Sequence, residues 1–342
     1  ATSSPVACPS RAVFIRFDAE LRGYPLDAHG VTSPCARISG PRTQLVERGP
    51  LAVSVHGYLH SLNFQSSTGY NGLTIHAPNA NGNVAPVRMA GVDQDYVALA
   101  VDSSINDYIV ANQGYEGEQC WYIVANDQHF SNRQNCDTNI NAVHALATNL
   151  RDELVVVGNE VGTGEGRIDI YDHPASTNSR LVRTIKGEKT GLASLSGTLG
   201  YFDVTYSLAT DPRSGAIYVY DHLFNFLGGG TIPGAGPAKI SEFAACANGN
   251  VAPQRVLSGP SLNLVDYAFG VNELAVDDRG ELYSLSRGAY AVVNVFGPQA
   301  RGNAPPLRTF VDRTAVIGSV GASIAVRTHE SPGEDALSGR GV

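Results

Sequence analysis

The sequence is short of charged residues and has neither a long apolar run nor a basic strip. Only 16% of the 342 residues are charged. No segment approaches the roughly 20 uninterrupted apolar residues that a membrane-spanning helix needs, so we expect no membrane span. The net charge of −8 comes from scattered acids, and nucleic acid is therefore excluded as a partner. Hydrophobic residues still reach 43%, which excludes the disordered class and allows a large core.

The sequence also lacks the short motifs that mark common active sites. It contains no Gly-x-Ser-x-Gly elbow, no HExxH, no phosphate-binding glycine loop and no EF-hand loop. It contains no CxxC, so a zinc site is not expected. Nucleophilic catalysis therefore has no candidate in the sequence.

Five cysteines are present, and four of them form two locally spaced pairs. We predict disulfides between Cys8 and Cys35 and between Cys120 and Cys136, with Cys246 left over. The alternative is that all five are buried thiols. The small, polar start, residues 1–5, is similar to the residues that follow a signal-peptidase site. These features together predict a secreted protein, extracellular or periplasmic.

An internal repeat is the strongest signal in the chain. The heptapeptide ANGNVAP occurs at residues 80–86 and again at 247–253, and a looser copy, GNAPPLR, occupies 302–308. Repeats at such intervals indicate a modular fold. An arginine recurs in these copies and in two weaker relatives. We expect it to position a neighbouring repeat, and it occurs as Arg37, Arg88, Arg183, Arg255 and Arg308.

A second element, an apolar residue followed by alanine and a small or apolar residue, recurs six times. Each copy precedes a polar turn and an alternating run, a pattern typical of short strands. Four strands in about 50 residues make a β-propeller blade. We therefore predict that residues 1–342 form one all-β domain, a six-bladed β-propeller of four-stranded antiparallel blades; seven blades is the alternative. The copies lie at 51–53, 99–102, 146–148, 208–211, 274–277 and 324–326.

The phrase running from LAVD through LY and VF to GNAPPLRT, residues 274–309, resembles the repeat of bacterial extracellular NHL-like six-bladed β-propellers. The resemblance covers most of residues 36–327. It implies a ring closed by strands from both termini, with 324–326 innermost and 12–17 in the same blade. Such propellers include binding modules, lyases and proteins of unknown role, so the resemblance implies architecture and not activity.

Candidate chemical residues precede the innermost strands, where propeller loops meet at the central channel. Asp95, Asp203 and Asp266 there are candidates for binding Ca²⁺ or for a general base, and His144 is the best-placed histidine. The three acids stand at unequal distances from their strands, so turn formation or capping is the alternative. No other cofactor is expected. Candidate ligand-binding aromatic residues are Tyr96, Trp121, Tyr206 and Tyr267, and Trp121, on a loop, is a candidate for stacking on a sugar ring.

With no catalytic motif in view, we predict a secreted, non-enzymatic propeller that serves as a binding or structural module. Its expected partners are other protein subunits or copies of itself. Two alternatives stay open: a propeller lyase or lactonase with a channel metal or an acid/base site, and a carbohydrate-binding propeller that binds glycans. The polar C-terminal extension, residues 328–342, is expected to pack on its own chain or on a neighbouring copy.

Overall fold

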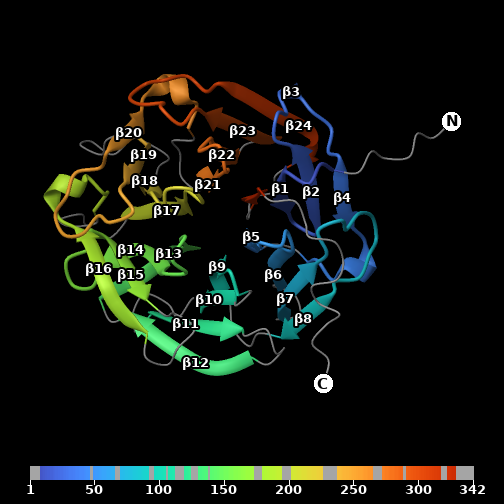
Figure 1. Ribbon diagram of the computed structural model, residues 1–342, viewed down its shortest axis with the longest axis horizontal. Helices are drawn as coiled ribbons and strands as arrows, with labels where there is room; N and C mark the ends of the chain where they lie inside the picture. Colours follow the sequence, from blue (N-terminus) through green and yellow to red (C-terminus); the bar gives the residue numbers. More distant parts are fainter. Residues whose placement is uncertain are drawn as a thin grey trace.

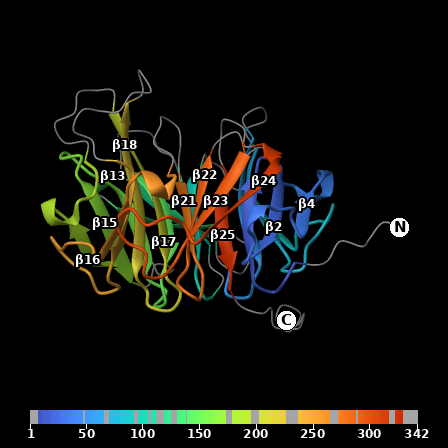
Figure 2. The ribbon, with the colours of Figure 1, turned by 90° about the horizontal axis from the view of Figure 1, so that it is seen from above.

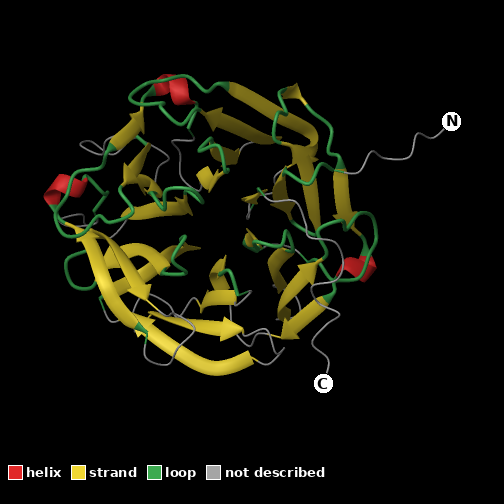
Figure 3. Cartoon of the chain, viewed as in Figure 1, coloured by secondary structure: helices red, strands yellow, loops and turns green. Residues whose placement is uncertain are grey.

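The computed structural model describes a chain of strands, tight turns and short loops. Helix is limited, among the described residues, to three 3-10 turns at the outer rim: η1 (Pro41–Thr43), η2 (Glu188–Thr190) and η3 (Pro260–Leu262) (Figure 3). None of the described helices is long and apolar enough to span a membrane. The described residues are 8–46, 49–65, 70–91, 96–104, 107–111, 119–124, 130–137, 139–172, 179–194, 202–225, 237–264, 272–287, 290–316 and 322–328.

The strands form sheets arranged like blades around a central axis, and Figure 2 shows the same sheets from the side. Five sheets have four strands and one has five (Figure 1). The four-stranded sheets are β25-β1-β2-β4 (Ser323–Arg327, Ala12–Phe17, Glu20–Pro25, Ala36–Ser39), β5 to β8 (Leu51–Val53, Leu59–Gln65, Tyr70–His76, Arg88–Gly91), β9 to β12 (Tyr96–Val101, Asp107–Ala111, Gln119–Val124, Phe130–Asp137), β13 to β16 (Ile140–Thr148, Leu154–Glu160, Gly166–Asp172, Arg180–Lys186) and β17 to β20 (Phe202–Thr210, Ile217–Asn225, Lys239–Phe243, Arg255–Ser258). The five-stranded sheet is β21-β22-β23-β24-β3 (Asn272–Val276, Leu282–Arg287, Tyr290–Phe296, Arg308–Val316, Gly30–Val31).

The structure is all-β and propeller-like, but the prediction of six four-stranded blades is wrong, and so is its alternative of seven. Only five sheets have the expected four strands. The remaining sheet carries the additional strand β3, which pairs in parallel with β24, whereas the prediction had only antiparallel blades.

The innermost strands β25, β5, β9, β13, β17 and β21 contain the six copies of the alanine-centred element, and each contacts the next around the axis. Small alanines fit where the blades converge. The core lies between neighbouring sheets. Val13 and Tyr24 of one sheet, for example, share a cluster with Tyr283 and Val293 of the next, and all four are fully buried. Burying one such side chain contributes about 1.5–3 kcal/mol.

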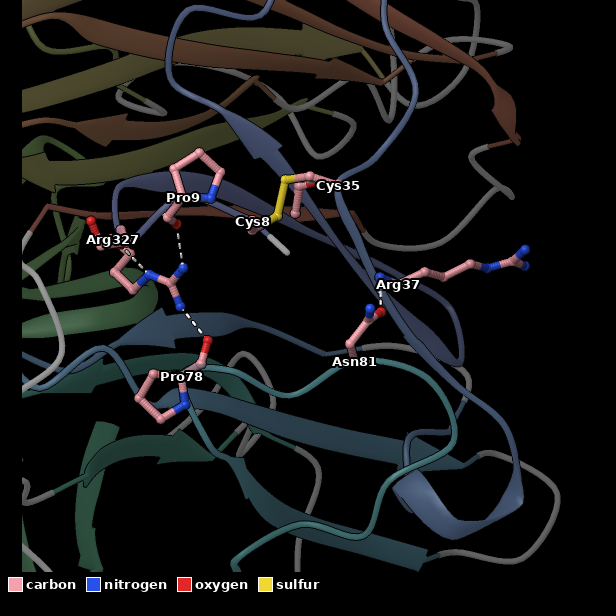
Figure 4. Close-up of a disulfide and its surroundings, with 9 residues drawn as sticks. Cys8, Pro9, Cys35, Arg37, Pro78, Asn81 and Arg327 are labelled. Atoms are coloured by element: carbon pink, nitrogen blue, oxygen red, sulfur yellow. Dashed lines mark hydrogen bonds between the residues drawn. A yellow bond between two sulfur atoms is a disulfide. The ribbon is translucent and has the colours of Figure 1, made fainter. Parts of the chain in front are cut away.

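The first and last described strands belong to one sheet. β25 pairs antiparallel with β1, with Ala325 opposite Phe14. Arg327, at the end of β25, is buried with its guanidinium 4.9 Å from the centroid of the Phe14 ring. It donates hydrogen bonds to the carbonyl of Pro9 at 2.7 Å and to the carbonyl of Pro78 (Figure 4). Because Pro78 follows β7, these bonds tie both ends of the described chain to the neighbouring sheet.

A disulfide joins Cys8 to Cys35, which confirms the first predicted pair (Figure 4). It links the segment before β1 to the residue preceding β4. The two cysteines are separated by 27 residues. Closing a loop of this length in the unfolded chain stabilises the fold by about 3–4 kcal/mol in the chain-entropy model.

The ANGNVAP repeat forms contacts between neighbouring sheets. Asn248 Oδ1 accepts a hydrogen bond from the backbone N–H of Thr184 at 3.1 Å, and Asn250 Oδ1 accepts one from the N–H of Lys189 at 2.8 Å. The loop before the fourth strand of one sheet is thereby fastened to the outer strand and 3-10 turn of the preceding sheet. We name this contact a latch. Three latches each include a parallel β-bridge: Gly82 with Ile38, Gly249 with Ile185, and Gly302 with Leu257.

The fifth strand is an extended form of the same latch. β3 lies in the connection between β2 and β4, and its residues Gly30 and Val31 pair in parallel with Phe310 and Val311 of β24. The next residue, Thr32, donates its N–H to the Val311 carbonyl at 3.0 Å. The other latches form a single bridge each and leave their sheets with four strands. A latch with two paired residues becomes a strand, which explains the incorrect strand count.

Four of the five recurring arginines form ion pairs within their sheets. Arg308 lies 2.6 Å from a Glu281 carboxylate oxygen, and its hydrogen bonds lower the pKa of Glu281. It also donates to the Tyr283 hydroxyl at 3.1 Å and to the carbonyl of Leu26, in the adjoining sheet, at 2.7 Å. The Arg308 bond to Leu26 reaches the adjoining sheet, as expected of an arginine that positions a neighbouring repeat. Equivalent ion pairs are Arg37–Glu20, Arg183–Glu153 and Arg255–Glu242.

Candidate functional site at the channel mouth

A cavity of about 250 Å³ opens at the end of the central channel where the innermost strands finish. Each innermost strand contributes one residue to its lining, always the third residue of the alanine-centred element. Four are valines and two are threonines, so this ring is mainly apolar, while the rest of the lining includes polar residues. We name these residues the channel ring: Val53, Val101, Thr148, Thr210, Val276 and Val326.

The two threonines of the channel ring occupy adjacent innermost strands. Thr148 Oγ1 donates to the Val101 carbonyl at 2.7 Å, and Thr210 Oγ1 donates to the Thr148 carbonyl at 2.6 Å. Both hydroxyl protons are therefore used to join neighbouring strands. Because a threonine hydroxyl can still accept hydrogen bonds, this sector of the ring differs in polarity from the valine sector.

Polar groups surround the channel ring and gather beside β9 and β13. The carboxylate of Asp152 accepts hydrogen bonds from the Ser103 N–H at 3.0 Å and from the Ser103 hydroxyl at 2.6 Å. Asn149 Oδ1 accepts from the N–H groups of Arg151 at 2.9 Å and Glu153 at 3.1 Å. We name Ser103, Asn149 and Asp152 the polar rim, and all three line the cavity.

The backbone at Asp152 is unusual. Its φ is +55°, in the left-handed region that non-glycine residues rarely adopt. The turn is held by Asn149 and by the bond from the Asp152 N–H to the Asn149 carbonyl at 3.0 Å. The strained turn places a carboxylate at the cavity, and such strain is common at functional sites.

His144, the predicted acid/base residue, lies in β13 at a bulge where the register with β14 shifts between Val143 and Ala145. Its ring packs edge-on against Tyr206, another predicted ligand residue, with centroids 5.3 Å apart. Asn159 donates to the Tyr206 hydroxyl at 3.3 Å. Burial lowers the pKa of His144 to about 4, so the imidazole is neutral at physiological pH and poorly matched to act as a general base there.

The remaining predicted site residues cannot be placed as a cluster. Asp95, Asp266 and Tyr267 lie outside the described residues. Asp203, Tyr96 and Trp121 belong to β17, β9 and β11, but their side chains are likewise not described. Of the predicted set, the structure brings together His144 and Tyr206. Across the described parts of the chain, no three His, Cys, Asp or Glu side chains are grouped to hold a metal ion. The calcium site therefore stays a prediction.

The second predicted disulfide has its backbone in register. Cys120 of β11 and Cys136 of β12 occupy directly opposite positions in an antiparallel pair. Their side chains are outside the described set, so this disulfide also stays a prediction. Cys246 is a free, exposed cysteine. The C-terminal extension, from residue 329 onward, lies outside the described residues.

The polar rim was missed from the sequence. Candidates were sought before each innermost strand, whereas Ser103, Asn149 and Asp152 follow such strands. A signal was nevertheless present, because the element continues with a polar residue in LAVD and LATN. These polar residues are turn formers by composition, and nothing in their spacing separates a turn from a binding rim.

Comparisons with known proteins support the fold and do not indicate a function. No protein-family model matches the chain. No curated protein matches it either. The resemblance to NHL-like propellers is therefore not confirmed.

Solved structures do match. A Bacteroides caccae protein of unknown function has a TM-score of 0.54 and 11% identity, covering 92% of this chain and 98% of its own. A functionally unknown Desulfotomaculum acetoxidans protein has a TM-score of 0.53 and 10% identity, covering 94% and 99%. A quinonprotein alcohol dehydrogenase-like protein from Bacteroides thetaiotaomicron has a TM-score of 0.51 and 12% identity, covering 93% and 79%. Identities this low show a shared fold and no shared activity.

Proposed function

We propose that this propeller is a non-enzymatic binding module that holds a small organic molecule at the channel mouth. The observation that carries the proposal is the cavity in which an apolar ring adjoins a rim of hydrogen-bond acceptors. Binding sites typically combine apolar walls with a few placed polar groups. A cavity of about 250 Å³ suits a molecule of only a few heavy atoms.

The polar rim defines the class of ligand. Asp152 contributes a carboxylate, and the Asn149 oxygen and the Ser103 hydroxyl add further acceptors. A carboxylate favours cationic or hydroxyl-bearing partners and disfavours anions. The ligand class proposed is therefore a compact amine or alcohol with a short apolar body, which would lie against the valines of the ring.

The state of the rim supports binding over catalysis. The Asp152 carboxylate already accepts two hydrogen bonds from Ser103, and the Asn149 oxygen accepts two backbone bonds. These hydrogen bonds fix the orientation of both side chains as acceptors at the cavity, as a binding site requires. The lyase or lactonase and the carbohydrate-binding alternatives depend mainly on side chains outside the described residues, and they stay predictions.

Two further observations support an exported binding module. The Cys8–Cys35 disulfide is compatible with an oxidising compartment, so we place the protein outside the cytoplasm, secreted or periplasmic. Latches cover four of the six outer strands, β4, β16, β20 and β24, through which sheets of two copies would otherwise pair. This covering favours binding at the channel over assembly through strand edges.

Ligand-observed NMR tests the proposal with three probes of equal size: aminobutanol, its diol analogue butanediol, and butyrate. We expect saturation transfer to the amine and the diol and none to butyrate. Val101→Phe fills the ring and should abolish the signal, whereas Val87→Phe, the same change at an exposed residue outside the cavity, should preserve it. Equal binding by both variants would place the probes elsewhere and refute the proposed site.

A further inference from the structure

A fully buried arginine lies between two sheets and forms no ion pair with a carboxylate in the part of the chain that the structure describes. Arg16, in β1, has a relative exposure of 0%. Its Nη2 group donates to the Val46 carbonyl and, at 3.0 Å, to Asn63 Oδ1. Its Nε and Nη1 atoms are buried and have no hydrogen-bond partner. Three N–H donors of a charged guanidinium thus remain unused.

The groups beside Arg16 are polar but not negative. Asn63 and Thr74 are buried and bond to each other at 3.0 Å. The Ser61 hydroxyl, on the same face of β6 as Asn63, is buried and without a partner. His76 is fully buried, and burial, together with the nearby charge of Arg16, lowers its pKa to about 4. His76 is therefore neutral and cannot balance the charge of Arg16.

No described carboxylate forms an ion pair with Arg16. Asp18 acts on it electrostatically, yet Asp18 is exposed in the turn after β1 and makes no hydrogen bond to it. The carboxylate nearest to Val46 in sequence is Glu47, which lies outside the described residues. An isolated buried charge costs several kcal/mol unless it is paired and hydrogen-bonded.

We propose that Arg16 is the centre of a buried site for a small monovalent anion of the halide class. The anion would accept a hydrogen bond from the unused Nη1 group, and the Ser61 hydroxyl is a further donor, on β6 of the adjoining sheet. A larger oxyanion or organic anion is not expected, because the surrounding side chains are packed at 0–2% exposure. The bound anion neutralises Arg16 and joins β1 to β6, so it acts as a structural ligand.

Thermal unfolding of the full chain tests the site. The protein is dialysed into gluconate and then titrated with chloride or bromide at constant ionic strength. We expect the midpoint to rise by about 4 °C or more once halide exceeds its dissociation constant a hundredfold. Arg16→Met removes the charge while keeping an apolar side chain of similar length, and it should abolish the halide-dependent rise. The matched control, Arg213→Met, replaces a half-exposed arginine and should keep the rise.

Bromide anomalous scattering from crystals of the wild type gives a second readout, which decides the question if Arg16→Met does not fold. A bromide peak beside the guanidinium supports the site. The proposal is overturned if the wild-type midpoint does not respond to halide and no bromide is found. In that case Glu47→Gln should lower the midpoint, which would identify the Glu47 carboxylate as the partner of Arg16.

Discussion

Removing the two asparagine bonds of one latch should measurably weaken the propeller, although the backbone bridge between Gly249 and Ile185 remains. In the second ANGNVAP copy, Asn248 and Asn250 accept one backbone hydrogen bond each, from Thr184 at 3.1 Å and from Lys189 at 2.8 Å. A hydrogen bond of this kind contributes about 1 kcal/mol net. Water can reach the freed N–H groups, since Thr184 is half-buried and Lys189 is exposed. Asn248→Ala with Asn250→Ala should therefore cost about 2 kcal/mol, and each single change about half of that.

The geometry of the preceding turn adds a second, larger perturbation of the same latch. Gly187 has φ +109°, and a Cβ there would lie 2.8 Å from Asn250 Cγ. Gly187→Ala therefore combines backbone strain with a steric clash against the latch. We expect it to cost more than the loss of Asn250 alone, and to cost less when Asn250 is already alanine, because the clash is then relieved.

The assay is denaturant unfolding followed by circular dichroism, with the free energy of unfolding compared among variants. The third copy provides a control, because Arg301 occupies the position of Asn248 and makes no equivalent bond among the described contacts. Arg301→Ala should change stability by less than about 0.5 kcal/mol. If the double variant is as stable as this control, the latches do not stabilise the ring and the reasoning fails.

Two other predictions concern titration and covalent structure. Burial lowers the folded-state pKa of His76 to about 4, below the ordinary value of 6.5, so folding favours the neutral imidazole. The free energy of unfolding is therefore unaffected by His76 above pH 6.5 and falls as pH is lowered towards 4, by about 3 kcal/mol in total. His76→Gln should flatten this part of the plot of stability against pH. An unchanged slope in the variant would contradict the assignment. For Cys120 and Cys136, directly opposite in register, we expect a disulfide. Thiol titration of the unreduced, denatured chain should find one free thiol, from Cys246, and three free thiols would contradict the pairing.

The sequence was sufficient to predict the strands, because the repeated elements have one physical role each. The alanine-centred element became the innermost strand in every sheet, and four of the five recurring arginines became ion-paired residues. The Cys8–Cys35 disulfide followed from its local spacing. The strand count was wrong at β3, since residues 27–32 keep only the alanine and the glycine of ANGNVAP in matching positions, as Ala28 and Gly30, although they occupy the same position against β24. Backbone pairing between sheets does not require a particular side chain. The number of residues paired in each latch could therefore not be predicted from the repeat.

The candidate site was less predictable than the fold. A residue that precedes an innermost strand lies at one end of the channel, and a residue that follows the strand lies at the other end. The sequence candidates were all residues at the end where the strands begin. The polar rim lies at the other end. His144 and Tyr206 did come together, yet the burial that joins them also lowers the pKa of His144 and weakens its predicted role as a base. Burial of this kind depends on the neighbouring blade and cannot be deduced from a single strand.

The most direct test of the binding proposal is methyl NMR of the valine-labelled protein during titration with aminobutanol. We expect saturable shifts in the methyl signals of the channel-ring residues Val53, Val101, Val276 and Val326, with no shift at exposed Val87. Binding should be weaker after Asp152→Asn. Shifts confined to residues away from the ring, or no saturable shift at any valine, would contradict the claim that the channel mouth is the binding site.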